Sequence, residues 1–320
     1  MTKISQKIKS SATTPTTPTR GLGTPPQAGG EKRKPLIGFI GQGFIGKNYA
    51  DDFEHRGFEV VRYAMEEPYR QNKEKIKECD IVFIAVPTPT TPKGFNFGIV
   101  QSVLSLVGKG KTAVVKSTLL PGTTEKLQEK HRDMFVFHSP EFLRERSAAH
   151  DAAHPSRNII GIPADNQKTR EAAKRVLEVL PSAPFSRVMS SREAEMVKYG
   201  GNNFFYVKVV YINMLYDLAE KLGCNFEAIK DALVADPRIG DSHMDPVHKS
   251  GHSEKSGRGA GGHCFIKDFA AFASFYESLL SDPASKKVLH ALQDKNNELL
   301  RNSGKDIDLL SEVYGQEVKK

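Results

Sequence analysis

The stretch LIGFIGQGFIGKNYADDF, residues 36–53, decides the fold. An apolar run at 36–40 has the character of a buried strand, and an apolar-periodic segment that predicts a helix follows GQGFIG. Gly41, Gly43 and Gly46 have GxGxxG spacing, in which the first glycine permits a tight turn and the second lets a pyrophosphate approach the backbone. The third lets the helix lie close to the strand, with its N-terminus facing the phosphates. This context predicts a dinucleotide-binding turn.

The same residues nearly spell a phosphate-binding P-loop, because Gly41, Gly46 and Lys47 match GxxxxGK. A P-loop needs a hydroxyl for magnesium at the next position, where this chain has Asn48. The strand DIVFIAV at 80–86 also ends without an Asp that would complete a magnesium site. The sequence therefore favours the dinucleotide turn over an NTPase.

Further apolar runs predict the rest of a sheet. They stand at 58–63, 80–86, 112–117, 134–138 and 158–162, separated by segments long enough for crossover helices. Continuous apolar strands that alternate with helices are typical of a parallel sheet covered on both faces. We expect residues 35–190 to form one Rossmann-type, doubly wound α/β domain.

The second predicted strand does not decide between NAD and NADP as the cofactor. Arg62 and Tyr63 stand near its end, where an acid normally holds the ribose 2′-hydroxyl of NAD. Arg62 would accept the 2′-phosphate of NADP, or it is simply an exposed arginine at a strand end. In the latter case Glu66 or Glu67 would reach the ribose, so NAD is expected and NADP is not excluded.

A long helix follows the sheet. Ser190 and Glu193 have the spacing of a capping box, and no Pro interrupts the segment before Gly223. Such a helix would be about 48 Å long at 1.5 Å per residue. Its apolar surface exceeds what one domain core needs, so we expect a homodimer. The side chains concerned are Phe204, Phe205, Tyr206, Val209, Val210, Tyr211 and Leu215.

The remaining chain is predicted to be mainly helical. A second helix at 226–235 should end at Asp236 and Pro237. Residues 238–263 are rich in Gly, His and Ser and form a longer stretch than is usual for an unstructured loop without a function. We expect residues 191–320 to form an all-α dimerisation domain that carries this loop.

Composition excludes several classes. The chain of 320 residues has a net charge of +8, and residues 1–34, with seven Lys and Arg against Glu31, supply +6 of it. We expect this Thr-, Pro- and Lys-rich segment to be a disordered tail, with a weak electrostatic tether as the alternative, and we expect no nucleic-acid binding by the body. Three scattered cysteines indicate a reducing compartment, and neither a secretory signal nor a membrane span is evident. A cytoplasmic protein is expected.

Cys264 has the setting of a reactive thiol. It lies in GAGGHCFIKD at 259–268, where glycines allow a substrate to approach and Lys267 would favour the thiolate. Cys79 and Cys224 stand where Cys commonly acts as a small core residue. This setting alone leaves open whether Cys264 is a nucleophile.

The same loop holds four histidines, His243, His248, His252 and His263. His248 and His252 have a spacing that metal sites use, but a closed zinc site needs four ligands and no second Cys is near. We expect a polar loop and no metal.

Two polar pairs have helical spacing. Lys198 and Asn202 share one face of the long helix, where they either line a wet subunit interface or form an oxyanion-stabilising Lys oriented by Asn. Glu141 and Glu145 in SPEFLRE are expected to share a helical face just after a strand whose carboxyl end faces the cofactor crevice. The alternative for these two is ordinary carboxylates in the first turn of a helix.

Seven motifs, taken in order, resemble the UDP-glucose/GDP-mannose dehydrogenase family from Leu36 to about Leu300. They are GQGFIG, VPTPT at 86–90, KSTLLPGTT at 116–124, SPEFLRE at 139–145, KYGGN at 198–202, DPRIG at 236–240 and GGHCFIKD at 261–268. The resemblance implies oxidation of the C6 alcohol of a nucleotide sugar, UDP-glucose first, to a carboxylate. It also implies two hydride transfers to NAD through a thiohemiacetal and a thioester on Cys264. GDP-mannose and UDP-N-acetylhexosamines are the alternative substrates.

The resemblance also implies roles for individual residues. Lys198 would stabilise negative charge on the sugar oxygen with help from Asn202, and Glu141 would act as general base through water held by Thr118 and Asp268. Cofactor contacts are implied for Gly41, Gly43, Phe44, Ile45, Gly46, Thr88, Ser117, Thr118, Glu145 and Lys267. Substrate contacts are implied for Glu141, Phe142, Leu143, Lys198, Asn202, Arg238, Gly262 and Cys264, with Arg238 reaching the neighbouring subunit's sugar nucleotide.

Three departures from the family pattern matter. The family normally carries a third domain that closes over the sugar nucleotide, and we expect this chain to end where that domain begins. The loop between Arg238 and Cys264 is longer than in many members and is expected to compensate, and Arg62 replaces the usual acid. A cofactor-binding protein that needs a separate lid domain for activity is therefore the alternative function.

Overall fold

The structure, a computed structural model, describes residues 33–252 and 254–315. The prediction of a disordered tail at 1–34 lies, up to residue 32, outside the described residues. None of the helices described combines the length and apolar character needed to cross a bilayer.

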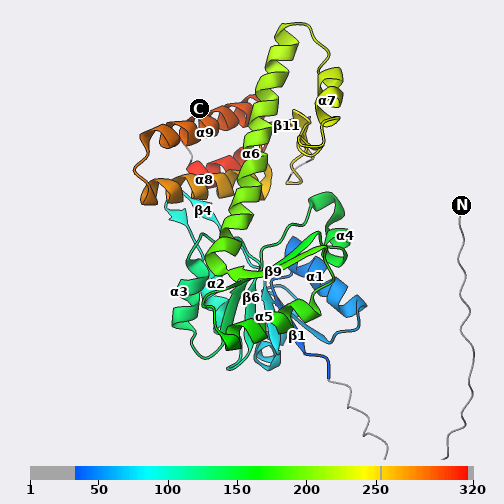
Figure 1. Cartoon of the computed structure of the whole chain (residues 1–320), viewed down its shortest axis with the longest axis vertical. Coiled ribbons are helices and arrows are strands. Elements are labelled where there is room, and N and C mark those ends of the chain that lie inside the picture. Colours follow the sequence, from blue (N-terminus) through cyan, green and yellow to red (C-terminus); the bar gives the residue numbers. More distant parts are fainter. Residues whose placement is uncertain (1–32, 253, 316–320) are drawn as a thin grey trace, which may run out of the picture. The chain divides into compact units, whose positions relative to one another are not determined.

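A seven-stranded sheet forms the first part of the described chain (Figure 1). Its strand order is β2-β1-β3-β6-β7-β8-β9. The strands are β1 (Ile37–Ile40), β2 (Val60–Tyr63), β3 (Ile81–Ile84), β6 (Thr112–Val115), β7 (Phe135–His138), β8 (Arg157–Ile162) and β9 (Phe185–Ser190). Helices cover both faces, which confirms the Rossmann-type doubly wound fold.

The two faces of the sheet build two cores because neighbouring strand residues point to opposite sides. Phe39 and Phe83 pack with α1 (Phe44–His55), α4 (Ala148–Ala153) and α5 (Gln167–Val179). Ile40 and Ile84 pack with the other layer, which consists of η1 (Tyr69–Glu78), α2 (Gly98–Leu104) and α3 (Thr123–Lys130). A short hairpin, β4 (Thr90–Thr91) with β5 (Gly94–Phe95), follows β3.

The expectation of an all-parallel sheet is wrong at one place, since β8 runs antiparallel to β7. A parallel neighbour would require the connection to return to the opposite edge of the sheet. Residues 139–156 instead stay at the carboxyl edge, where they carry Glu141, the one-turn helix η2 (Glu145–Ser147) and α4 beside α1. The strand β9, parallel to β8, was not among the predicted strands.

The long helix α6 (Ser191–Lys221) begins with the predicted capping box, in which Ser190 and Glu193 bond reciprocally. It runs from the sheet along the helical elements (Figure 1), and α7 (Phe226–Val234) ends before Asp236 as predicted. The following stretch is less irregular than expected, because β10 (Val247–His248) and β11 (Gly257–Arg258) pair in it. The helices α8 (Gly262–Leu279), α9 (Pro283–Ser303) and α10 (Ile307–Tyr314) complete the described chain.

Two contacts fix α6 between the sheet and α8. Tyr206 stacks on Phe269 of α8 with ring centroids 3.9 Å apart. The fully buried Glu195 accepts hydrogen bonds from the Gly122 amide (2.6 Å) and from the Thr124 amide (2.8 Å) and hydroxyl (2.6 Å). Because the N-cap of α3 is glycine, Glu195 supplies the cap that this helix lacks.

This buried carboxylate predicts a pH-dependent stability. Burial raises the pKa of Glu195 to about 7, although the Thr124 and Gly122 donors act to lower it. The folded protein therefore keeps a proton that the unfolded chain releases near pH 4.5. The bound proton stabilises the folded protein fully below pH 4.5. As the pH rises through about 7, this contribution to the unfolding free energy, roughly 3 kcal/mol, is lost.

The measurement is urea unfolding of the wild type and Glu195→Gln at several pH values between 4 and 8. The variant lacks the titrating group, so we expect the unfolding free energy of the wild type to fall relative to that of the variant across this interval. Parallel pH profiles for the two proteins would show that Glu195 does not titrate there.

Candidate active site

The β1–α1 turn has the shape that a dinucleotide phosphate needs. Gly41 has φ +91°, and a Cβ there would lie 2.3 Å from the Ala85 carbonyl oxygen. A Cβ on Gly46 would lie 1.9 Å from the Gly41 carbonyl oxygen. Helix α1 can therefore pack this closely against the turn only because residue 46 has no side chain. A Cβ on Gly43 would meet nothing within 4 Å, which leaves open space at the N-terminus of α1. These features fit a bound pyrophosphate.

Lys47, which the P-loop hypothesis would place on phosphates, forms an ion pair with Asp51 one turn along α1 (2.6 Å). Asn48 donates to the Phe44 carbonyl oxygen at 2.7 Å. Both side chains are thus engaged along the helix, which agrees with a dinucleotide turn.

Arg62 is not the exposed arginine that we favoured from the sequence. Its side chain is only 12% exposed and forms ion pairs with Asp51 and Glu54 of α1, both at 2.7 Å. The end of β2 faces α1, so the guanidinium reaches the acids of the helix. Its charge is already compensated by two carboxylates.

The ends of β3 and β6 are tied together by Ser117. Its hydroxyl accepts from the Val86 amide (3.0 Å) and donates to the Val86 carbonyl oxygen (2.7 Å). Ser117 was predicted to contact the cofactor, but this hydroxyl orders the loop after β3. Thr88 in that loop is buried, and Thr118 at the end of β6 is half-buried.

Glu141 and Lys198 form a buried ion pair where the sheet meets α6. The Lys198 ammonium lies 2.6 Å from Glu141 Oε1 and 2.8 Å from the Glu141 carbonyl oxygen, and each side chain is 6% exposed. Burial acts to raise the pKa of Glu141, but Lys198 and the Leu143 amide hold it below its usual range. Burial likewise opposes the charge on Lys198, but Glu141 raises its pKa. Both groups are therefore charged at neutral pH.

The segment that holds Glu141 differs from the prediction. Residues 139–144 have no regular secondary structure, and the one-turn helix η2 begins only at Glu145, so Glu141 and Glu145 do not share a helical face. Pro140 disfavours helix in the residue before it, and Glu141 accepts the Leu143 amide at 2.9 Å instead of joining a helix. Phe142 stacks on Arg157, whose guanidinium carbon is 3.6 Å from the ring centroid.

A second buried lysine, Lys116, was not identified as a site residue. Its ammonium lies 4.1 Å from the Tyr49 ring centroid and 3.4 Å from the Ser139 hydroxyl. Burial lowers its pKa to about 8, and Lys198 adds to the shift while Glu141 opposes it. The signal in the sequence was a lysine placed directly after an apolar strand, at the edge where Glu141 stands.

Cys264 lies in the first turn of α8 and its side chain is exposed. Desolvation by the surrounding protein raises the pKa of the thiol, and Lys198 acts in the opposite direction. Asp268, one turn along α8, is buried and accepts from Asn202 Nδ2 at 2.6 Å and from Lys267. Asn202 thus orients Asp268, and Lys198 is held by Glu141, which differs from the expected Lys–Asn partnership.

Three other predicted residues have the following surroundings. Gly262 opens α8 with φ +78°, a conformation that favours glycine. The Glu145 carboxylate lies against Gly251, where a Cβ would be 1.3 Å from Oε2. Arg238 forms an ion pair with Asp236, and its side chain is 87% exposed.

The histidines of the loop have separate partners. His243 stacks on Phe205, and His248 lies 3.1 Å from the Lys305 ammonium. His252 contacts His263 at 3.0 Å and Asp308 at 2.7 Å. Within residues 33–252 and 254–315, no group of three or more His, Cys, Asp or Glu side chains is placed to hold a metal ion.

Fold and site together define the class: an α/β protein with a glycine-rich turn after its first strand and a buried Lys–Glu ion pair at the carboxyl edge of its sheet. The chain belongs to the UDP-glucose/GDP-mannose dehydrogenase family. The model of the family's NAD-binding domain matches residues 66–180, and the model of its central domain matches residues 192–298. The glycine turn precedes the first match, so its assignment depends on the geometry given above.

Individual relatives agree with this assignment. UDP-glucose 6-dehydrogenase of Rickettsia bellii is 29% identical over 264 residues, which cover 79% of this chain and 56% of that protein. The enzyme of the same name from Rhizobium meliloti is 30% identical over 212 residues, covering 62% and 46%. The structure of a UDP-glucose dehydrogenase from Pyrobaculum islandicum superposes with a TM-score of 0.70 at 29% identity, covering 86% of this chain and 71% of that one. The chain spans about half the length of the curated relatives it matches.

Proposed function

We propose that this chain oxidises the C6 alcohol of a nucleotide sugar, UDP-glucose first, to a carboxylate with NAD. The observation that carries the proposal is the buried Lys198–Glu141 ion pair, which lies near enough to Cys264 for Lys198 to oppose the rise in the pKa of its thiol. A protein that only bound a dinucleotide would have no use for this combination of a nucleophile, a cation and a base. The names of the relatives support the nucleotide sugar as substrate.

The chain's own groups divide the work. The β1–α1 turn, with Gly41, Gly43 and Gly46, would hold the pyrophosphate of NAD, which supplies the hydride acceptor when bound. Lys198 has three N–H donors, and Glu141 uses two of them among the described residues. The third is available to a sugar oxygen that develops negative charge, which is the role of an oxyanion donor.

Cysteine explains how one site oxidises twice. After the first oxidation the C6 aldehyde accepts the Cys264 sulfur, and the thiol proton passes to the oxygen, giving a thiohemiacetal. Loss of a second hydride and a proton gives a thioester, and water then releases the carboxylate and restores the thiol. We propose that Glu141, held ionised by Lys198, accepts protons in these steps, and that Asp268 helps to hold the attacking water.

We propose NAD over NADP as the cofactor. A 2′-phosphate near the end of β2 would compete for Arg62 with Asp51 and Glu54, which already form ion pairs with it. The same carboxylates would repel the phosphate.

The test of this function is NADH formation, followed by absorbance, by the purified chain with NAD or NADP and a panel of UDP-glucose, GDP-mannose and UDP-N-acetylhexosamines. We expect NADH with one of these sugars. Because the chain spans about half the length of the curated relatives it matches, a protein that needs a separate lid domain for activity is the second candidate. If the folded chain alone forms no NADH with any of these sugars, that result would favour the second candidate.

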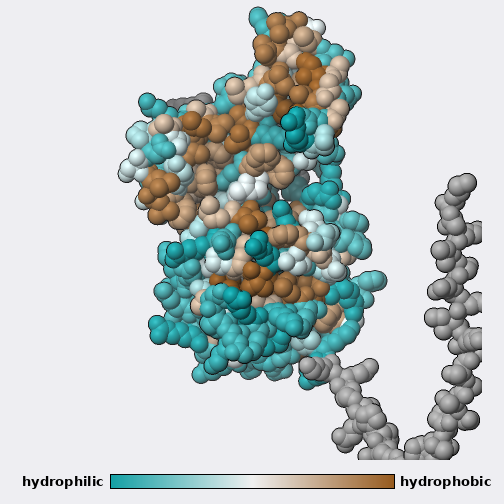
Figure 2. All heavy atoms as spheres, in the orientation of Figure 1, coloured by the Kyte–Doolittle hydropathy of each residue, from teal (hydrophilic) through white to brown (hydrophobic). Residues whose placement is uncertain are grey.

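We also propose that the enzyme is a homodimer formed through α6. One face of this helix exposes an apolar stripe at spacings of mostly three and four residues, and α6 is far longer than the sheet contact requires. Figure 2 shows apolar surface gathered around the far end of α6. The stripe consists of Met196, Phe204, Val207, Tyr211, Met214, Leu218 and Leu222. A stripe of this spacing is typical of a helix that packs on a partner helix.

Replacing Tyr211 and Leu218 together by Glu tests the dimer. Both side chains are more than half exposed in the single chain, so the exchange should leave the fold intact and place charges in the interface. We expect sedimentation to change from dimer to monomer. Glu220→Gln, on the opposite side of α6, is the matched control, and a wild-type monomer would contradict the proposal.

A further inference from the structure

The helix that carries Cys264 begins without a cap of its own. Its N-cap residue is Gly261, which has no side chain, so the amides of the first turn need an acceptor from elsewhere. The preceding stretch, residues 238–261, is long and must end in one conformation if the thiol is to stand at a fixed place.

Asp306 provides the missing acceptor from 44 residues further along the chain. Its Oδ2 accepts the Gly262 amide at 2.8 Å, and its Oδ1 accepts the Ser250 hydroxyl at 2.9 Å. Asp306 is 4% exposed and lies directly before α10. One carboxylate therefore joins the start of the Cys264 helix to the loop that leads to it.

Asp306 also explains Gly261. The backbone of Gly261 has φ −108°, which any residue adopts, so conformation alone does not require glycine. A Cβ at this position would lie 2.1 Å from Asp306 Oδ2 and 3.0 Å from Lys305 Cε. Glycine at position 261 therefore leaves the space that Asp306 and Lys305 occupy.

Lys305 acts on the same loop. Its fully buried side chain donates to the carbonyl oxygens of Gly259 (3.0 Å) and Gly257 (3.4 Å) in and after β11. It also lies 3.1 Å from Nε2 of His248 in β10. His248 Nδ1 lies 3.0 Å from the Asp245 carbonyl oxygen, so the tautomer with the proton on Nδ1 satisfies both contacts. Lys305 therefore connects both strands of the hairpin.

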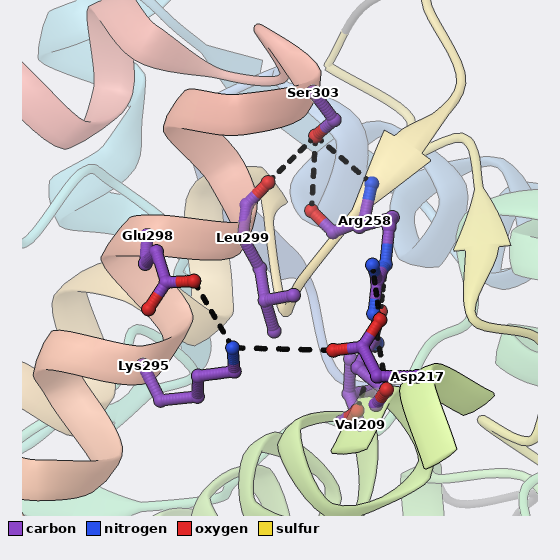
Figure 3. Close-up of polar contacts among 8 residues, drawn as sticks. Val209, Asp217, Arg258, Lys295, Glu298, Leu299 and Ser303 are labelled. Atoms are coloured by element: carbon purple, nitrogen blue, oxygen red, sulfur yellow. Dashed lines mark hydrogen bonds and ion pairs between the residues drawn. The ribbon is translucent and has the colours of Figure 1, made fainter. Parts of the chain in front are cut away.

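Figure 3 shows how the other side of the hairpin is fixed. Arg258 forms an ion pair with Asp217 of α6 at 2.6 Å, and the Ser303 hydroxyl accepts the Arg258 amide at 3.0 Å. The hairpin is thus anchored to α6 and to the end of α9. Lys305 and Asp306, which follow α9, supply the contacts nearest to Cys264.

We propose that Lys305 and Asp306 are positioning residues that set the start of α8, and with it the place of the Cys264 thiol. The pair lies beyond residue 298, where the match to the family's central domain ends. Helix α10, which follows the pair, packs on Ile266 and Ala270 of α8 through Leu309, Leu310 and Val313. The effect on turnover depends on the proposed function, whereas the effect on the loop does not.

Amide hydrogen exchange of the peptide around Gly262 tests the structural half of the proposal without any enzyme assay. In Asp306→Ala the Gly262 amide loses its charged acceptor, so we expect its exchange to accelerate about 10-fold or more. Asp306→Asn keeps a carbonyl oxygen for the amide and should stay close to the wild type. Glu312→Ala, an exposed change on α10, is the matched control. Unchanged exchange in Asp306→Ala would overturn the proposal.

Turnover tests the functional half. In Asp306→Ala we expect kcat to fall about 10-fold or more, because the thiol no longer stands at a fixed place. Asp306→Asn should recover most of kcat. A fall in exchange protection with unchanged kcat would overturn the positioning role, whereas an inactive wild type with altered exchange in the variant would refute the proposed function alone.

A double variant removes any ambiguity from misfolding. Gly261→Ala should resemble Asp306→Ala, because its methyl group would displace the carboxylate. In Gly261→Ala/Asp306→Ala the conflict is absent, so the second change should add less than its separate effect on exchange. Full additivity would show that the two residues do not act through one contact.

Discussion

Cys264→Ser is expected to lower the rate of carboxylate formation by a factor on the order of 10³ or more. A serine hydroxyl keeps the size of the side chain but is a far weaker nucleophile and a poorer leaving group than a thiol, so both formation and hydrolysis of the acyl intermediate fail. Because Cys264 is an exposed residue in the first turn of α8, we expect the variant to fold like the wild type. Steady-state rates and product analysis of the purified variant provide the measurement.

The chain offers a matched control in Cys224, the other exposed thiol, which follows the helix-ending Gly223 far from Lys198 in sequence. Cys224→Ser should retain full turnover. Cys79 is fully buried in the core and is unsuitable because its replacement tests packing. Unchanged turnover in Cys264→Ser, or an aldehyde as the final product of the wild type, would contradict covalent catalysis by Cys264.

We expect the second large effect, on both kcat and stability, from Lys198→Met. Loss of the ammonium removes the proposed oxyanion donor, which should lower kcat by a factor on the order of 10²–10³. It also leaves Glu141 buried without its partner at 2.6 Å, which should destabilise the protein by about 3–5 kcal/mol. Without Lys198 the pKa of Glu141 should rise, because burial then acts with less opposition.

The double variant Lys198→Met/Glu141→Gln separates the two consequences. With no charge left unpaired, much of the lost stability should return, since replacing both members of a buried pair costs far less than removing one. Activity should not return. Thermal or urea unfolding together with steady-state rates distinguishes these outcomes, and a stable, fully active Lys198→Met would refute the role given to this lysine.

Local signals explain why much of the fold was predictable from the sequence. Apolar runs identified β1, β3, β6, β7 and β8, and the capping box at Ser190 fixed the start of α6. The direction of β8 was not predictable, because an apolar strand looks the same in either direction. What decides it is the path of residues 139–156, which depends on their packing beside α1.

The candidate site shows the same limit. Residue types and spacing indicated Cys264, Lys198 and Glu141, and in the structure Lys198 and Glu141 form an ion pair. The partner of each side chain depends on tertiary contacts, as in the bond from Asn202 to Asp268 and the ion pairs of Arg62. Asp306 was missed because its role is to accept a hydrogen bond from the amide of Gly262, 44 residues away in the sequence. No local sequence pattern indicates such a contact.

The stoichiometry of the reaction tests the central claim most directly. A limiting amount of the sugar that gives activity is converted to completion with excess NAD, and the NADH and the carboxylate product are both measured. The account predicts two NADH and one carboxylate for each sugar with the wild type, and the loss of the carboxylate and of the second NADH in Cys264→Ser. One NADH with an accumulated aldehyde from the wild type, or carboxylate formation by Cys264→Ser at the wild-type rate, would contradict it.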